Sequence, residues 1–440
     1  MSAINAKASR KMEKYAVLTR EPRCFLGSLA FSWEQRKLSE MCGTFEYGLN
    51  AAAKEFDGKN KYIRITDIDD ASREFLLSDL SSPDICLDGM SKYLLSSGDI
   101  VFARTGASVG KTYIYRENDG IVYFAGFLIR AKVNQDNDAE FVFQSTLSPS
   151  YEKYIRITSQ RSGQPGVNAQ EYGEYDLFAP SKEEQQRIGH FLRGIDNLIT
   201  LHQRKFEKLT NVKKSMLEKM FPQNGCSYPE IRFKGFTDAW EQRKLGELVD
   251  RVVRKNTNNE STLPLTISAQ YGLVDQITYF NNRVASRDVS NYYLVLNGEF
   301  AYNKSTSDGY PFGAVKRLDL YEKGVLSTLY IVFSPKKEQQ VDSDFLTVFF
   351  DTDRWHKGVA ERAAEGARNH GLLNISAEDF FDIDLSVPKD VAEQKQIGAF
   401  IRQLDNLITL HQRELEKLQN IKKSMLEKMF VYGGTRKWES

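Results

Sequence analysis

The sequence is poor in the residue types that most enzymes and metalloproteins use for chemistry. Its four cysteines (Cys24, Cys42, Cys86 and Cys226) are scattered without a C-x-x-C pair, and it has only five histidines in 440 residues. Scattered cysteines argue against a disulfide framework or a metal site and fit a reducing cytoplasm. So few histidines leave little for general acid–base catalysis. Neither a G-x-G-x-x-G nor an H-E-x-x-H motif occurs.

Long apolar runs and an excess of one charge are also absent. No run approaches the roughly 18 apolar residues of a membrane span. The start, MSAINAKASRKMEKYAVLTR, has basic residues but no following apolar segment, so we expect a loosely ordered tail rather than a signal peptide. The formal net charge is +1, whereas nucleic-acid binders usually carry a basic footprint. DNA binding would therefore depend on local patches or on a basic partner.

One stretch resembles a nucleotide-binding loop. FARTGASVGKTYIY (Phe102–Tyr115) has the glycine, lysine and threonine of a P-loop, but the first glycine is Gly106, one residue later than G-x-x-x-x-G-K-[ST] requires. A P-loop also leads from a strand into a helix. Here DIVFA precedes the loop and KTYIY follows it, and both favour strands. The pattern predicts strand–loop–strand, so nucleotide hydrolysis is a minor alternative.

The chain is internally duplicated. WEQRKL occurs at 33–38 and 240–245, DNLITLHQR at 196–204 and 405–413, and KKSMLEKMF at 213–221 and 422–430. Each half thus has a short motif, a variable block and a long repeat. Such repetition indicates two copies of one structural unit.

The variable blocks keep faint parallels in their polar loops. SGDIVFARTGASVGK corresponds to NGEFAYNKSTSDGYPFGAVK, and QRSGQPGVNAQEY to ARNHGLLNISAEDF. Arginine, lysine and asparagine suit contacts with phosphates and base edges, although such loops can also be merely solvated turns. The candidate DNA-binding residues are Arg104, Thr105, Ser108, Lys111, Arg161, Ser162 and Gln164 in the first block, and Asn303, Lys304, Ser305, Ser307, Lys316, Arg368, Asn369 and His370 in the second.

The long repeats predict two long helices. A heptad frame places Ile188, Ile195, His202, Leu209 and Met216 at one position, and the second copy repeats the frame. This is the seam of a coiled coil, and the near-identity of the two copies suggests that they pair antiparallel. The seam histidines (His202 and His411) fix the register, extend their polar ends to water, or form a ligand- or pH-sensitive switch. The lysine-rich helix ends (KKSMLEK) are either solvated or face a partner or DNA phosphates.

A duplicated scaffold with divergent readers suits a two-part DNA target, because two readers at a fixed spacing impose a spacing between half-sites. The architecture resembles the specificity subunits of type I restriction–modification systems. The residues that carry the resemblance are FTDAWEQRKLGEL (Phe236–Leu248) before the second block and the long repeat Glu393–Phe430 after it, each with its copy in the first half. The segment around Phe102–Tyr115 is similar to one common in the family's recognition domains.

The resemblance implies an α+β fold in which two mixed α/β target-recognition domains are joined by two long antiparallel helices that form a pseudo-twofold coiled coil. The recognition domains are expected at 31–180 and 223–388, and the helical spacers at 181–222 and 389–430. An N-terminal tail (1–30) and a C-terminal tail (431–440) would flank them.

The resemblance also implies a non-catalytic, cytoplasmic subunit that binds double-stranded DNA and two modification (methyltransferase) subunits, and that joins restriction subunits with translocase and nuclease activity. No cofactor is expected on this chain, since S-adenosylmethionine, ATP and magnesium would reside on the partners. A stand-alone DNA-binding protein and a pure assembly scaffold remain alternatives.

Overall fold

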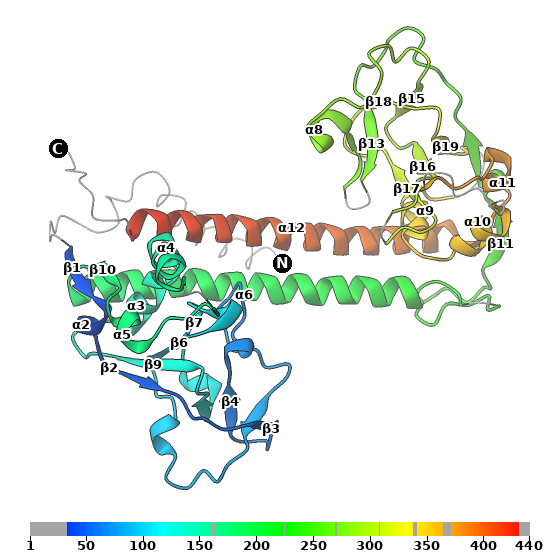
Figure 1. The fold of residues 1–440 in the computed structure, drawn as a ribbon. Coiled ribbons are helices and arrows are strands. Elements are labelled where there is room, and N and C mark those ends of the chain that lie inside the picture. The colour runs from blue at the N-terminus through cyan, green and yellow to red at the C-terminus, as the bar shows by residue number, and fades with distance from the viewer. Residues whose placement is uncertain are drawn as a thin grey trace. The chain divides into compact units, whose positions relative to one another are not determined.

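The computed structural model describes residues 33–160, 163–223, 225–268, 271–307, 309–337, 341–363 and 371–430, so both predicted tails lie outside the described residues. The chain divides into two compact units. Unit 1 comprises Met1–His202 and Glu414–Ser440, and unit 2 comprises Gln203–Arg413. Each unit therefore contains one sheet domain and a part of each long helix (Figure 1).

The sheet domain of unit 1 is built mainly from antiparallel strands. Its central sheet has the order β2-β9-β6-β7. β1, the first strand of the domain, pairs with β10, its last strand. The strand DIVFA is buried at every position and LIRAKV over its first four residues, and their β-branched and other apolar side chains suit a buried sheet. The strands are β1 Glu34–Lys37, β2 Cys42–Tyr47, β3 Ala53–Glu55, β4 Lys61–Ile63, β5 Ser81–Pro83, β6 Asp99–Ala103, β7 Thr112–Ile114, β8 Val122–Phe124, β9 Leu128–Val133 and β10 Asp176–Ala179, and the short helices are α2 Leu38–Met41, α3 Ala139–Ser145, α4 Pro149–Thr158 and α5 Ala169–Gly173.

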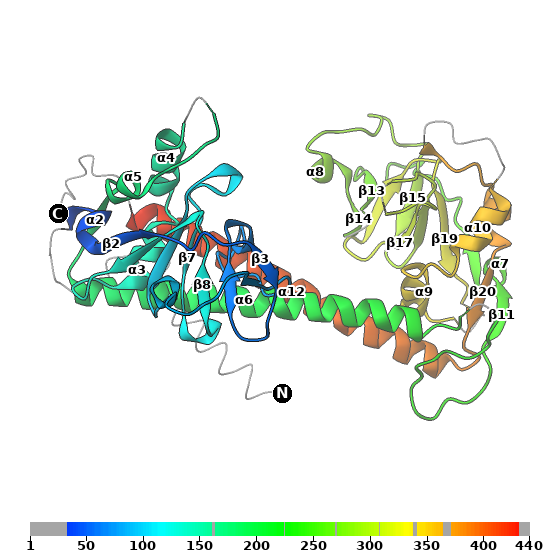
Figure 2. The same ribbon diagram turned by 60° about the horizontal axis from the view of Figure 1, so that its bottom comes forward.

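Unit 2 repeats this order of elements. Its central sheet runs β12-β19-β16-β17. β11 pairs with β20 (Figure 2), as β1 pairs with β10 in unit 1. The strands are β11 Glu241–Lys244, β12 Val249–Arg251, β13 Leu265–Ser268, β14 Gly272–Asp275, β15 Tyr293–Leu296, β16 Phe300–Asn303, β17 Ala314–Arg317, β18 Lys323–Leu326, β19 Ile331–Pro335 and β20 Asp384–Val387, and the short helices are α7 Leu245–Leu248, α8 Gln276–Phe280, α9 Ser343–Phe350, α10 His356–Arg362 and α11 Ala377–Phe381.

The long repeats form the two predicted long helices. They are α6 Lys182–Lys219 and α12 Val391–Met429, of 38 and 39 residues. Acidic residues in each first turn favour the positive end of the helix dipole, and Pro222 follows α6 closely. The heptad seam is confirmed by burial, since Ile188, Ile195 and Leu404 are all less than 9% exposed.

In each unit the helix segments pack side by side in opposite directions. In unit 1, Asp196 of α6 pairs with Lys422 of α12 at 2.5 Å. In unit 2, Lys213 of α6 pairs with Asp405 of α12 at 2.7 Å. The two aspartates come from the two copies of DNLITLHQR and the two lysines from the two copies of KKSMLEKMF. Each helix thus contributes one aspartate and one lysine to these two ion pairs. The predicted fold class is confirmed.

The end of each long helix enters the core of a sheet domain. In unit 1, Phe430 lies 5.3 Å from Phe141 and 6.4 Å from Trp33, measured between ring centroids. In unit 2, the ring of Phe221 lies 5.7 Å from that of Trp240. Each tryptophan also donates from its indole nitrogen, at 3.3 Å, to a glutamate at the start of the other long helix segment in its unit. The repeated WEQRKL and KKSMLEKMF motifs therefore meet in one core.

In unit 2 the helix pair takes part in a larger ion-pair network. Asp351, which follows α9, lies 2.7 Å from Lys316 of β17 and 3.4 Å from Lys213. The side chains of Lys213 and Asp351 are each 20% exposed. Burial alone would raise the pKa of the Asp351 carboxyl, but the ammonium groups of Lys316 and Lys213 outweigh this and hold its pKa below the usual value. This network links the helix pair to the sheet.

The lowered pKa of Asp351 gives a pH-dependent prediction. The folded carboxylate has a pKa below the unfolded value of about 3.9, so its ion pairs stabilise the fold above that value, and this contribution is lost as the pH falls through the folded pKa. We expect Asp351→Asn to lower the free energy of unfolding by about 3 kcal/mol at pH 7. The difference from the unmodified protein should shrink as the pH falls below about 4 in urea titrations. Asp319→Asn is the control, since Asp319 pairs with Arg317 but is 54% exposed, and it should cost less than about 1 kcal/mol. A D351N deficit that stays constant with pH would contradict this prediction.

Candidate nucleic-acid interface

The loop that resembles a P-loop joins two antiparallel strands. β6 and β7 pair through Ile100↔Ile114 and Phe102↔Thr112, with a single 3-10 turn at Gly106–Ser108 between them. No helix follows the loop, because Thr112–Ile114 is strand. Successive amides therefore do not wrap a phosphate as they do at a P-loop helix. The strand–loop–strand prediction is confirmed, and the geometry argues against nucleotide hydrolysis.

In unit 1 the structure joins the two predicted DNA-facing loops. Thr105 and Gly166 form an isolated antiparallel bridge. The Gly106 amide donates to the Pro165 carbonyl at 3.0 Å, and the Val167 amide donates to the Arg104 carbonyl at 2.9 Å. Gln164 also reaches the first loop, since its amide nitrogen lies 3.1 Å from where a Gly106 Cβ would be. The two loops form one surface.

Unit 2 makes the same junction with different residues. Ser305 and Leu372 form the bridge. The Thr306 amide donates to the Gly371 carbonyl at 2.7 Å, and the Leu373 amide donates to the Lys304 carbonyl at 3.0 Å. By this register Lys304 stands where Arg104 stands in unit 1. The backbone frame is shared, whereas the side chains that it displays differ.

The predicted site residues occupy different environments. Arg104, Thr105 and Ser108 are partly exposed and Gln164 is exposed, while Arg161 and Ser162 lie outside the described residues. In unit 2, Ser305 and Ser307 are exposed and Asn303 is partly exposed, with its side-chain oxygen accepting from the Ser305 amide at 3.0 Å. Arg368, Asn369 and His370 lie outside the described residues. Direct contact of these residues with DNA stays a prediction.

Three of the predicted lysines are engaged within the protein. Lys111 pairs with Asp70 at 2.5 Å, and its side chain is 16% exposed. Lys316 belongs to the Asp351 network and is 18% exposed. The Lys304 ammonium donates to the Ile375 carbonyl at 3.3 Å. Their sequence context suggested exposed loop lysines, and the aspartates that pair with two of them are remote in sequence.

Exposed aromatic residues beside the loops were not singled out by the sequence. Tyr47, at the end of β2, is 46% exposed, and Phe127, between β8 and β9, is 59% exposed. Both flank Arg104: its guanidinium lies 5.0 Å from the centre of the Tyr47 ring, and its amide donates to the Phe127 carbonyl at 3.0 Å. In unit 2, Tyr279 and Phe280 are 49% and 51% exposed, but they belong to α8, which lies outside the two joined loops of that unit. No motif marks these positions, so only their exposure in the fold identifies them.

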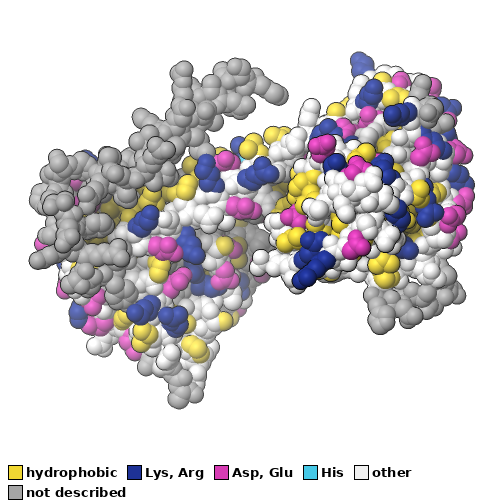
Figure 3. Space-filling model, turned by 90° about the horizontal axis from the view of Figure 1, so that it is seen from above, with side chains coloured by type: hydrophobic (Ala, Val, Ile, Leu, Met, Phe, Trp, Pro, Cys, Tyr) yellow, Lys and Arg dark blue, Asp and Glu magenta, His cyan; other side chains and the backbone are white. Residues whose placement is uncertain are grey.

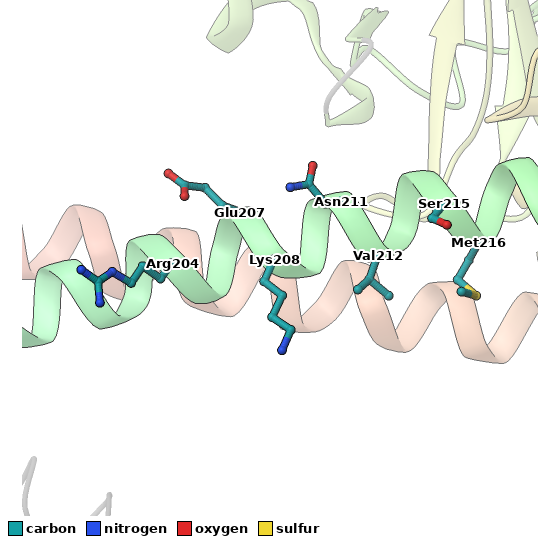
Figure 4. Close-up of a pocket in the computed structure, with 7 residues that line it drawn as sticks. All are labelled: Arg204, Glu207, Lys208, Asn211, Val212, Ser215 and Met216. Atoms are coloured by element: carbon teal, nitrogen blue, oxygen red, sulfur yellow. The ribbon is translucent and has the colours of Figure 1, made fainter. Parts of the chain in front are cut away.

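The described residues do not include a cluster suited to a metal ion. No group of three or more His, Cys, Asp or Glu side chains that could hold one occurs among them. None of the described helices is both long and apolar enough to cross a membrane. A shallow groove follows one face of α6, but Glu207 and Asn211 extend away from Lys208 and Val212, so its polar groups do not converge (Figure 4). The groove is lined by Arg204, Glu207, Lys208, Asn211, Val212, Ser215 and Met216.

The surface charge is mixed. On the face that Figure 3 presents, lysine and arginine side chains alternate with aspartate and glutamate. This agrees with a formal net charge of +1. Long-range electrostatic attraction of a nucleic acid by this chain alone is therefore weak.

Comparisons with known proteins agree on one family. The model of the type I restriction modification DNA specificity domain matches two segments, residues 32–211 and 238–420. In Methanocaldococcus jannaschii, a protein named for the MjaX type I restriction enzyme specificity subunit is 22% identical over 423 residues, which cover 91% of this chain and 93% of the relative. The type I restriction enzyme MjaVIII specificity subunit of the same organism is 23% identical over 368 residues, 81% of this chain and 83% of its own.

A solved structure shares the fold. The S subunit of a type I restriction-modification system from M. genitalium superposes with a TM-score of 0.63 and covers 93% of this chain and 99% of its own. The two sequences are 13% identical, so this likeness concerns the fold.

The loop geometry predicts the effect of a substitution at Gly110. Its φ is +84°, and an added Cβ would lie 2.6 Å from Ile155 Cγ2. We expect Gly110→Ala to lower the free energy of unfolding by about 2–4 kcal/mol, since left-handed strain and overpacking add. Gly163→Ala is the control, because nothing lies within 4 Å of its added Cβ.

Mg-ATP should not raise the melting temperature of the unmodified protein. If G110A is as stable as the unmodified protein, and if Mg-ATP stabilises the unmodified protein but not G110A, the loop binds nucleotide.

Proposed function

Because the chain belongs to the type I restriction-modification DNA specificity family, which its two halves match over residues 32–211 and 238–420, we propose that it directs such a complex to a bipartite DNA sequence. Each sheet domain would read one half-site of double-stranded DNA. The carrying observation is that both units join the same two loops by the same backbone bridge, Thr105↔Gly166 and Ser305↔Leu372.

The differences between the paired loops support two distinct half-sites. Unit 1 displays Arg104 and Gln164 on the shared frame, and unit 2 displays Asn303 and Ser305. Bases are distinguished by the donors and acceptors that side chains offer to their edges. One scaffold with two side-chain sets would therefore read two different short sequences. In this proposal the long helices hold the readers and carry no base specificity.

The long helices also offer equivalent surfaces for partner subunits. Leu201 of α6 and Leu410 of α12 occupy the same place in the two copies of DNLITLHQR, and they are 45% and 51% exposed. A single exposed leucine is common on protein surfaces, and these two are singled out because both copies of the repeat expose the same position. Their presence in both copies supports two equivalent docking sites, and hence two modification subunits.

This proposal assigns the chemistry to the partners. S-adenosylmethionine would be used by the modification subunits, and ATP and magnesium by restriction subunits that join them in the cytoplasm. The chain itself would act without catalysis, in keeping with its small number of histidines. Its mixed surface charge implies that partner subunits supply much of the phosphate binding.

A domain exchange tests the bipartite model. Replacing residues 249–383, from β12 to the residue before β20, by the block of another family member should change one half of the methylated sequence and preserve the other. The β11–β20 pair and both long helices stay intact in this exchange. The measurement is sequencing of methylated adenines in a host that carries the modification subunit. The reciprocal exchange of residues 42–175 should change the opposite half. A change in both halves from one exchange would refute the assignment of one domain to one half-site.

The docking model predicts a change in stoichiometry. Leu410→Glu should remove one of the two modification subunits, and the double variant Leu201→Glu/Leu410→Glu should remove both, because a charge placed in an apolar contact is costly. Mass measurement by light scattering after gel filtration counts the bound subunits. Leu320→Glu is the control, since Leu320 is 61% exposed and lies on the sheet domain of unit 2. Retention of two modification subunits by the double variant would place the docking surface elsewhere.

A further inference from the structure

Arg104 is held in a fixed orientation by three neighbouring segments. Its guanidinium lies over the ring of Tyr47, 5.0 Å from the ring centre. Its amide donates to the Phe127 carbonyl at 3.0 Å, and its carbonyl accepts from the Val167 amide at 2.9 Å. Tyr47 is itself fixed, since its hydroxyl accepts from the Ala169 amide at 3.3 Å. Backbone and side chain of Arg104 are thus both constrained before any ligand binds.

The hydrogen-bonding edges of Arg104 are unused within the described part of the chain. No carboxylate, carbonyl or hydroxyl of the described residues accepts a hydrogen bond from its guanidinium. Aromatic stacking engages only the face of the planar group. The donors along its edge therefore remain available while the Tyr47 ring limits its rotation.

Arg130 of β9, in the same sheet domain, is stacked on a ring but bonded within the protein. Arg130 lies 5.0 Å from the centre of the Phe124 ring, but it is 3% exposed. Its guanidinium donates to the Leu94 carbonyl at 2.7 Å and to the Lys92 carbonyl at 2.9 Å, and it also pairs with Glu46. Stacking accompanies internal bonding at Arg130. At Arg104 the guanidinium is also stacked on a ring, but its N–H groups donate to none of the described residues.

The donor pattern of Arg104 selects a particular base. A guanidinium offers two parallel N–H groups that match the O6 and N7 acceptors of guanine in the major groove. Holding the group in place before binding reduces the entropy lost in making that contact. The partly exposed ring of Tyr47 lies against the guanidinium, so an approaching base edge meets an apolar surface beside the oriented donors.

Unit 2 lacks this device at the corresponding position. Lys304 takes the place of Arg104 in the shared frame, and its ammonium donates to the Ile375 carbonyl at 3.3 Å. An ammonium is a point charge without a planar pair of donors. The two units therefore differ in how they can read a base at this position.

We propose that Arg104 reads a guanine in the half-site bound by the first recognition domain, and that Tyr47 is the positioning residue for Arg104. This inference rests on the proposed function, since it requires that the domain bind DNA in a sequence-specific complex. It adds the base, the side chain that recognises it and the residue that orients that side chain.

The first experiment identifies the base by sequencing methylated adenines in cells that carry the complete complex. Arg104→Ala and Arg104→Lys should make one G·C pair of one half-site degenerate while the second half-site is unchanged. Lys304→Ala is the matched control and should leave that G·C pair specified. If R104A methylates the unaltered sequence, Arg104 makes no specific contact, and the proposal is overturned. If R104A binds all DNA sequences more weakly by the same factor, and its binding depends less on salt, Arg104 contacts a phosphate, and the proposal is likewise overturned. Absence of any sequence-specific methylation with the unmodified chain would instead refute the proposed function.

The second experiment separates positioning from folding. In the assembled complex, replacing the recognised guanine by 7-deazaguanine removes N7 and should weaken binding about 5- to 100-fold, the range of a bidentate base contact. R104A should abolish this penalty. Tyr47→Leu should reduce it several-fold, whereas Tyr47→Phe, which keeps the ring, should retain it. If Y47L lowers affinity for both DNAs equally and the 7-deazaguanine penalty is unaltered, Tyr47 supports only the fold, and its positioning role is overturned.

Discussion

In each unit, the end of a long helix packs into the sheet domain and holds the two kinds of repeated motif together. Phe430 and Phe221, from the two copies of KKSMLEKMF, pack against Trp33 and Trp240, from the two copies of WEQRKL. The ion pairs Asp196–Lys422 and Lys213–Asp405 fix the helix segments against each other within each unit. These contacts need the same residues in both copies. The near-identity of the repeats therefore follows from packing.

The reading surface depends on this scaffold but is free to vary. In each unit the two loops are joined through backbone atoms, by Gly106 to Pro165 in the first and by Thr306 to Gly371 in the second. Backbone bridges place few demands on side-chain identity. Side chains on the loops can therefore change without loss of the frame, which explains how two copies of one fold come to display Arg104 in one unit and a bonded Lys304 in the other.

The sequence predicted the features that repeat locally and missed those that depend on distant partners. The helices α6 and α12 followed from the heptad frame, and β6 and β7 from a short run of β-branched and aromatic residues. The bonding of Lys111 to Asp70 and of Lys316 to Asp351 could not be predicted, because pairing partners remote in sequence leave no periodic signal. Tyr47 was missed for a related reason: it ends a strand far from the loop whose arginine it orients.

The position of Phe430 in unit 1 has a consequence for synthesis on the ribosome. The core around Ile188 and Leu192 also contains Leu418, Leu426 and Phe430, close to the C-terminal end of the chain. A growing chain that has completed the first sheet domain must therefore expose the apolar face of α6 until the last helix emerges. Unit 2, which is formed by Gln203–Arg413, lies wholly within that interval and can assemble earlier. The domain made first is thus completed last, and until then its apolar α6 face is available to the matching repeat of a neighbouring chain.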